Sequence, residues 1–233
     1  VFIGGGTPTC IDPADLDDLL SFIRKAFDKS GWGEFAIEAS PETVTPGLAR
    51  LLKKQGITRV SLGVQEFNDE VLKGIGRRHD SKTACDAYRM LKDAGIPTVN
   101  IDLMIGLVDQ GLSNIDNMLV WVKRLMPDSI TVYNTRLKKS VPMHATLEAQ
   151  PDRFASGKEL FVMRIRLQEG LKALGYTEKC LRWFVREDKH MLDYQVRKLS
   201  ETADVIGLGL SAYSFVNNCQ YINHATLRNY EQR

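Results

Sequence analysis

The sequence has few cysteines, no long apolar run and almost no net charge. Its 233 residues include 4 cysteines, and 31 Lys+Arg against 29 Asp+Glu leave a formal charge of +2. No apolar stretch approaches the roughly 18 residues that span a bilayer. So small a net charge argues against nucleic acid or an anionic membrane as the main partner. A hydrophobic fraction of 43% excludes a disordered chain.

The cysteines are too few for a disulfide framework and too far apart for a short metal-ligand spacing: Cys10, Cys85, Cys180 and Cys219. A reducing cytoplasm is the expected compartment, and the opening residues, Val1-Phe2-Ile3 followed by glycines, show no basic n-region or cleavage site of a secretory signal. The chain does not begin with Met, and its last residues resemble the middle of a helix. We therefore expect it to be a fragment cut at both ends.

Short β-rich runs alternate with helical patterns through the first two thirds of the chain. Strands are expected at 1–3, 35–37, 60–64, 99–105 and 130–133. Asp12 and Pro13 suit the start of one helix, Thr45 and Pro46 that of the next, and Ser81 can cap a third. This alternation predicts an α/β fold in which helices cover a parallel sheet.

Two architectures fit that alternation, a doubly wound sheet and part of a (β/α) barrel. Each expected strand ends in glycine or a polar residue: Gly4 to Gly6, Glu38, Gln65, Asp102 and Asn134. Side chains from several strand ends that meet at one mouth form the site of a (β/α) barrel. We therefore favour a partial TIM-like barrel.

The pattern changes near Met143. A loop is expected at 151–157, an amphipathic helix at 160–174, short β-like pieces after Tyr176, a polar helix at 193–202 and a glycine-interrupted strand at 205–212. We divide the chain into a barrel core, residues 1–142, and an appended C-terminal α+β region, residues 143–233.

The run from Gly4 to Thr9, Gly-Gly-Gly-Thr-Pro-Thr, directly follows the first expected strand. Glycines let a ligand lie against the backbone and expose its polar groups, although a flexible turn explains bare glycines as well. The run is not a P-loop, because no Gly-Lys-Ser/Thr follows. It is not a Rossmann fingerprint either, because Pro8 and the acid of the second strand are wrongly placed.

Polar side chains at the strand ends are the other candidates. Glu38 could accept from an amine or a ribose hydroxyl or be a structural acid, and Gln65 can both donate and accept. Asp102 lies inside an apolar strand, where a charge is costly unless it is paired or faces a polar cavity. Arg77 and Arg78 could hold a carboxylate or form a solvated surface.

In combination, four segments resemble the radical S-adenosylmethionine (SAM) superfamily, and more narrowly the family of oxygen-independent coproporphyrinogen III oxidase and the related heme chaperone. They are residues 2–9, 61–68, 100–107 and 207–212, and the resemblance runs over nearly the whole chain. It implies a barrel that binds SAM through Gly5, Gly6, Thr7, Glu38, Gln65, Arg77, Asp102 and Met104. The first three would hold the methionine amino end through backbone groups, and the last would line the adenine.

The resemblance also implies chemistry and partners. In the family, a [4Fe–4S] cluster reduces the sulfonium of SAM, and the 5′-deoxyadenosyl radical abstracts hydrogen from the substrate. In the oxidase, a propionate side chain then loses carbon dioxide. The implied protein is a cytoplasmic oxidoreductase of porphyrin and heme biosynthesis. Its small-molecule ligand would be a porphyrinogen or heme, and flavodoxin or ferredoxin its electron donor.

One departure from the family concerns the cluster. Its Cys-x3-Cys-x2-Cys loop, upstream of the glycine motif, has no match here, so we expect the ligands in a missing N-terminal segment and no activity from this fragment alone. Cys10 occupies an aliphatic position of the family and is expected to be buried. No catalytic residue is assigned. Residues 179–186 match the heme chaperone poorly. Heme delivery without turnover, a radical SAM methyltransferase and a scaffold without a cluster remain alternatives.

Overall fold

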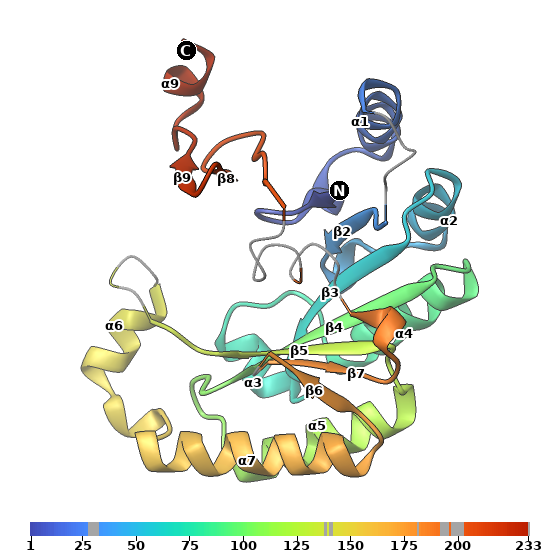
Figure 1. Cartoon of the computed structure of the whole chain (residues 1–233). Helices are drawn as coiled ribbons and strands as arrows, with labels where there is room; N and C mark the ends of the chain where they lie inside the picture. The colour runs from blue at the N-terminus through green and yellow to red at the C-terminus, as the bar shows by residue number, and fades with distance from the viewer. Residues whose placement is uncertain are drawn as a thin grey trace.

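A computed structural model describes residues 1–27, 33–137, 139, 142–180, 182–191, 196 and 203–232. These residues form a curved seven-stranded sheet with helices on its outer face, and a separate two-stranded hairpin near the C-terminus (Figure 1). The sheet has the strand order β1-β2-β3-β4-β5-β7-β6.

The bounds of the elements follow the alternation expected from the sequence. The strands are β1 (Phe2–Ile3), β2 (Ala36–Ala39), β3 (Arg59–Gln65), β4 (Thr98–Ile105), β5 (Ser129–Asn134), β6 (Thr177–Lys179), β7 (Trp183–Val185), β8 (Tyr213–Val216) and β9 (Cys219–Ile222). The α-helices are α1 (Pro13–Ala26), α2 (Pro46–Lys54), α3 (Asp69–Gly74), α4 (Ser81–Asp93), α5 (Leu112–Leu125), α6 (Pro142–Ala149), α7 (Gly157–Ala173) and α9 (Leu227–Glu231). Short 3-10 turns are η1 (Pro8–Cys10), η2 (Pro41–Thr43), η3 (Pro151–Arg153) and η4 (Asp188–His190).

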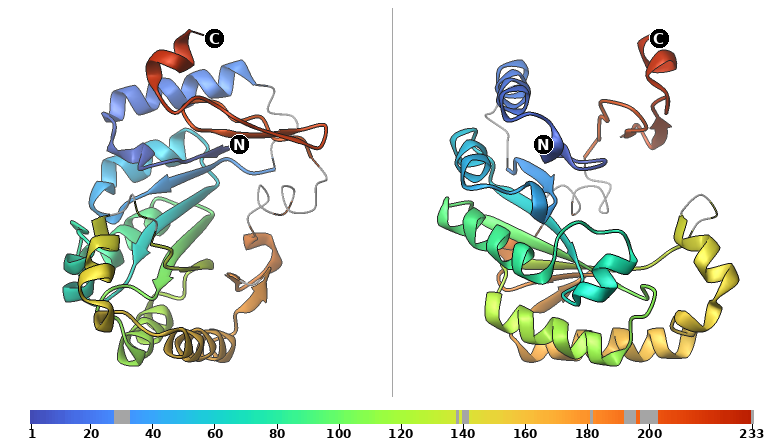
Figure 2. Two further views of the ribbon diagram at one scale, coloured as in Figure 1. Left: turned by 90° about the vertical axis from the view of Figure 1, so that its left-hand side faces the viewer. Right: turned by 180° about the vertical axis from the view of Figure 1, so that it is seen from behind.

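The first five strands are parallel and lie side by side in chain order. A doubly wound sheet reverses its strand order and carries helices on both faces. Here α1, α2, α4 and α5 all lie on the outer side of the curve, as both views of Figure 2 agree. The fold is therefore the expected partial (β/α) barrel, and its described strands form an open arc.

The two faces of the arc differ in chemistry because side chains alternate along each strand. Ile101, Leu103 and Ile105 of β4 are fully buried in the apolar core under the helices. Asp102 and Met104, between them, are half-buried on the opposite, concave face. The concave face is thus the polar one.

Side-chain caps begin the helices much as expected. Asp12 accepts from the backbone N–H of Ala14 at α1, and Thr45 accepts from that of Leu48 at α2. The prediction of Ser81 as a cap was wrong. Asp80 caps α4, and Ser81 is its first helical residue, with its backbone N–H donating to Asp69.

The C-terminal region adds to the same sheet. α7 packs on α5, and β7 pairs antiparallel with β5, followed by β6. The strand predicted at 205–212 was wrong: Val205 makes a single bridge to Phe215, and the paired strands are β8 and β9. Gly209 and Ser211 take left-handed φ values of 98° and 56°, which interrupt an extended run. The helix predicted at 193–202 falls outside the described residues except for Val196.

Within the part of the chain that the structure describes, no helix is long and apolar enough to cross a membrane.

Candidate functional site

The glycine run after β1 lies against the carboxylate of β2. The backbone N–H of Gly5 donates to Oε2 of Glu38 at 3.3 Å. A Cβ added at Gly4 would stand 2.8 Å from the Glu38 carboxyl carbon and 2.7 Å from the Phe2 ring. Gly5 itself has a φ of +98°, which L-residues rarely adopt. The backbone conformation therefore favours glycine at position 5, and a side chain at position 4 would displace Glu38 or Phe2.

Beyond this contact the loop is open. An added Cβ at Gly5 or Gly6 would meet no atom within 4 Å, and both residues are exposed, so a ligand can approach the backbone closely. Thr7 is half-buried, and its carbonyl accepts from Cys10 N at 2.9 Å. Cys10 is exposed, so its predicted burial was wrong. It ends a 3-10 turn that turns its side chain away from the core.

Asp102 is held by neutral donors. Asn100 donates from Nδ2 to its Oδ1 at 2.8 Å. Burial raises the pKa of Asp102 to about 7, against the lowering effect of hydrogen bonds from Asn100 and Thr131. No cation lies within ion-pair distance of it among the described residues. The alternative of a buried ion pair is therefore not what the structure shows.

Asn100 links Asp102 to the opposite end of the barrel interior. Its Oδ1 accepts from the hydroxyls of Ser129 at 3.0 Å and Thr131 at 3.2 Å. Ser129 in turn accepts from Nη2 of the buried Arg59 at 2.8 Å. This series of hydrogen bonds fixes the orientation of the Asn100 amide, and so fixes the N–H group that donates to Asp102.

Glu38 and Asp102 share the concave face with one strand between them. In register, Glu38 pairs with Ser61 and Ser61 pairs with Asn100. Burial raises the pKa of Glu38, and the Gly5 N–H opposes the shift. The nearby Glu38 charge also raises the pKa of Asp102. Two desolvated acids on one face, one of them beside the open glycine loop, form a site suited to a cationic ligand.

Gln65 turns back over the same face. It ends β3 with a left-handed φ of 69°, and the pairing with β4 shifts register just before it. Its Nε2 lies 3.0 Å from the point where a Gly63 Cβ would be. Met104 lies on this face two residues beyond Asp102, and β5 places Tyr133 beside it. The structure therefore brings Gly5, Glu38, Gln65, Asp102 and Met104 to one face.

Arg77 is not brought into that group by any contact. It follows α3, is half-buried, and has no side-chain partner among the residues that the structure describes. Arg78 is exposed. The next residue, His79, is buried and contacts Oε2 of Glu42 and the carbonyl of Val64, both at 3.1 Å. His79 thus anchors the loop of Arg77 to the end of β3.

Sequence reasoning missed a buried clasp between Glu66 and Gln110. Glu66 accepts from Gln110 Nε2 at 2.6 Å and from the backbone N–H of Phe67 at 2.7 Å. Gln110 also donates to the Met104 carbonyl at 3.0 Å and accepts from Gly106 N at 2.7 Å. The clasp joins the ends of β3 and β4, which carry Gln65 and Met104.

The sequence offers only a weak signal for the clasp. Glu66 has the apolar Phe67 on one side but the polar Gln65 on the other, so it lacks the two apolar neighbours that drew attention to Asp102. Burial raises the pKa of Glu66 to about 7, while its hydrogen bonds hold it down. The burial of Glu66 at this position therefore costs free energy whenever its carboxylate is ionised.

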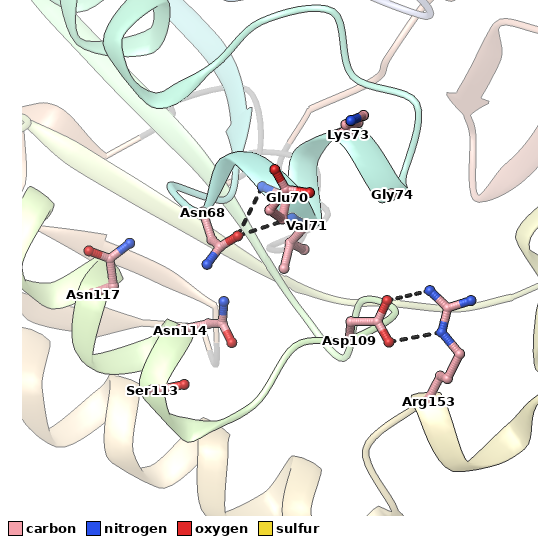
Figure 3. A pocket seen from close by; sticks show the side chains of 10 residues that line it. All are labelled: Asn68, Glu70, Val71, Lys73, Gly74, Asp109, Ser113, Asn114, Asn117 and Arg153. Carbon is pink, nitrogen blue, oxygen red and sulfur yellow. Dashed lines mark hydrogen bonds and ion pairs between the residues drawn. The ribbon is translucent and has the colours of Figure 1, made fainter.

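A pocket of about 560 Å³ lies apart from the concave face, between α3 and α5 (Figure 3). Several of its polar groups already have partners. Asn68 caps α3, Asn114 belongs to the cap of α5, and Asp109 forms an ion pair with Arg153. None of the predicted site residues lines it. We therefore place the candidate site on the concave face.

The residues present fit SAM better than they fit an iron–sulfur cluster. The open glycine loop and the two desolvated acids offer backbone acceptors and carboxylates for an ammonium and a sulfonium. In contrast, no group of three His, Cys, Asp or Glu in the described residues could hold a metal ion. The four cysteines are all free.

Comparison with known proteins bears on the family and the fold of the chain. Residues 1–119 match the radical SAM superfamily. The chain is 25% identical over 234 residues to the heme chaperone HemW of Bacillus subtilis, covering 99% of this chain and 60% of that protein. It is 27% identical over 243 residues to the oxygen-independent coproporphyrinogen III oxidase of Escherichia coli, covering 99% of this chain and 52% of that one.

Among solved structures, the chain is similar to coproporphyrinogen III oxidase (HemN) from Escherichia coli, described as a radical SAM enzyme. The TM-score is 0.86 at 25% identity, over 99% of this chain and 56% of that one. The chain thus spans little more than half the length of these relatives.

Proposed function

The chain belongs to the radical SAM superfamily, and on that premise we propose that its concave face binds SAM for radical chemistry on a porphyrinogen. The observation that carries the proposal is the meeting of the open glycine loop with Glu38, which has one strand between it and Asp102. Similarity over 99% of the chain to coproporphyrinogen III oxidase supports the substrate class.

In this proposal each residue of the face has a part. The backbone groups of Gly5, Gly6 and Thr7 hold the methionine amino end. Glu38 and Gln65 bind the polar groups of SAM that lie beside them. Asp102 accepts a hydrogen bond from SAM at the side of the face away from the glycine loop. These acids are already partly desolvated, so a cationic cofactor gains more from them than it would in water. Arg77 lies on a loop fixed by His79 and is proposed to reach SAM from there.

Met104 presents an apolar surface for the adenine ring, and its carbonyl is tied down by Gln110. When bound beside a reduced [4Fe–4S] cluster, SAM supplies hydrogen-atom abstraction. The residues of this chain position it and exclude water. Because the described residues do not fit the cluster, we derive no step through it. The electron donor, flavodoxin or ferredoxin, and a cytoplasmic location remain predictions.

The overall activity proposed for the whole protein is oxidative decarboxylation of a propionate side chain in heme biosynthesis. The test is anaerobic reconstitution of the complete gene product with iron and sulfide, followed by reduction in the presence of SAM. We expect a [4Fe–4S] spectrum and formation of 5′-deoxyadenosine. A protein that binds no cluster and forms no 5′-deoxyadenosine would contradict the proposal.

Heme binding and delivery is a second candidate, favoured by the similarity to HemW over 99% of this chain. Two parallel assays on the complete protein separate the candidates. Turnover of coproporphyrinogen III with release of carbon dioxide supports the oxidase. Stoichiometric heme binding without turnover supports the chaperone.

A further inference from the structure

The guanidinium of Arg182 is fixed between two aromatic rings at the edge of the concave face. Its carbon lies 4.7 Å from the centroid of the Trp183 ring and 5.8 Å from that of Tyr133. The Arg182 carbonyl accepts from Val132 N at 2.8 Å, which ties its backbone to β5. Contacts of this kind orient an arginine and leave its N–H edges free to donate.

The charge of Arg182 is not neutralised within the described part of the chain. The residue is exposed, and no carboxylate there lies within ion-pair distance of it. The acids on the same face are engaged elsewhere, Glu38 with Gly5 and Asp102 with Asn100. An oriented arginine with no acid beside it is well placed for an anion from outside the chain.

Arg182 lies on the opposite side of the face from the glycine loop. The sheet order puts β5 and β7 beyond β4, and Tyr133 pairs in register with Met104. At about 4.8 Å per strand, β7 is roughly 10 Å from β4. A ligand at Arg182 is therefore beside the adenine end proposed for SAM and far from the loop proposed to hold its methionine end.

We propose that Arg182 is a specificity-determining residue that anchors a carboxylate of the substrate. Its planar fork matches a carboxylate in a bidentate pair, and the rings of Tyr133 and Trp183 hold that fork in place. This inference rests on the proposed function, because it assumes a substrate bound next to SAM. It adds a contact that the proposed function does not contain: the residue that holds a free carboxylate of that substrate, with the rings of Tyr133 and Trp183 beside it.

The test measures binding rather than turnover. Coproporphyrin III and its tetramethyl ester are titrated by fluorescence into the complete, reconstituted protein in one detergent-containing buffer. The variants are Arg182→Gln, Arg182→Lys and Tyr133→Leu, with Arg166→Gln as the matched control. Arg166 is an exposed arginine on α7 that pairs with Asp116 on the outer surface.

We expect Arg182→Gln to weaken coproporphyrin III binding about tenfold or more and to leave the ester unchanged, since one charge-assisted pair is lost. Arg182→Lys and Tyr133→Leu should fall between Arg182→Gln and wild type, and Arg166→Gln should match wild type. The inference is overturned if Arg182→Gln binds coproporphyrin III as wild type does, or if it weakens both probes equally.

SAM affinity, measured in the same samples, separates this inference from the proposed function. It should stay within about twofold in Arg182→Gln, because the proposed SAM contacts lie on β2 to β4 and in the segments that follow β1 and α3. A loss of SAM affinity in Arg182→Gln would place Arg182 on the cofactor and overturn the inference. A wild-type protein that does not bind SAM would refute the proposed function itself.

Discussion

The backbone N–H of Gly5 donates to Oε2 of Glu38 at 3.3 Å, across 33 positions of sequence. This hydrogen bond joins the loop after β1 to β2 at the carboxyl edge of the sheet. It leaves the other oxygen of Glu38 against the backbone of Gly4. The acid and the loop are therefore positioned as one unit, and a change in either should disturb the other.

Gly4→Ala should separate the glycine loop from Glu38. Its Cβ would overlap the Glu38 carboxyl and the Phe2 ring, so we expect a loss of about 1–3 kcal/mol in the free energy of unfolding. Gly157→Ala at the start of α7 is the control, because an added Cβ there meets nothing within 4 Å. Urea unfolding of both variants measures the difference. Equal stability would show that the loop and Glu38 are not in contact.

Asp102 should make stability depend on pH. Its pKa is about 7 in the folded protein, above the ordinary value of 3.8. A raised carboxyl pKa contributes stability that is complete below about pH 4 and is lost as pH rises through about 7. Asp102→Asn removes this loss, so it should be more stable than wild type at pH 8, by at least about 1 kcal/mol.

The free energy of unfolding of wild type and Asp102→Asn, measured at pH 4.5 and at pH 8, checks this prediction. Some pH dependence will remain in Asp102→Asn, because Glu66 shifts in the same direction. A variant that loses stability at pH 8 would show that the ionised Asp102 stabilises the fold.

The fold and much of the candidate site were predictable from local patterns. Five alternating strands and the polar residue at each strand end indicated a barrel, and the apolar neighbours of Asp102 marked it as unusual. Each of these signals is contained within a few consecutive residues. It can therefore be recognised without knowledge of tertiary contacts.

Features that depend on contacts across the sheet could not be read in this way. Gln110 acts through Glu66, 44 positions away, and neither residue alone shows the pairing. Arg182 matters because two rings from different strands flank it. The strand predicted at 205–212 failed because left-handed residues such as Gly209 break a run whose apolar composition favours a strand.

The clasp between residues 66 and 110 should require a hydrogen-bond acceptor on one side chain and a donor on the other. In Glu66→Gln, an amide N–H₂ would face the N–H₂ of Gln110, so we expect a loss of about 1–3 kcal/mol in the free energy of unfolding. Glu66→Gln combined with Gln110→Glu restores the pair and should recover stability. The double variant still lacks the donor to the Met104 carbonyl and should remain weaker in SAM binding.

Glu70→Gln, an exposed change on α3, is the control for both measurements. If Glu66→Gln is as stable as wild type, the clasp does not hold the strand ends together.

The C-terminal segment has its own steric requirement. A Cβ at Gly207 would collide with the backbone of Tyr213, the first residue of β8. Gly207→Ala should therefore speed hydrogen exchange in β8 and β9 and leave that of β3 and β4 unchanged. Unchanged exchange in the hairpin would mean that Gly207 does not lie against Tyr213.

The central claim is that the concave face binds SAM through its two desolvated acids. Anaerobic calorimetric titration of the complete, reconstituted protein with SAM tests it most directly, in wild type, Glu38→Gln, Asp102→Asn and the exposed control Glu169→Gln. We predict that each of the two site variants loses at least about tenfold in affinity and that Glu169→Gln loses none. Wild-type affinity in both Glu38→Gln and Asp102→Asn would contradict the claim.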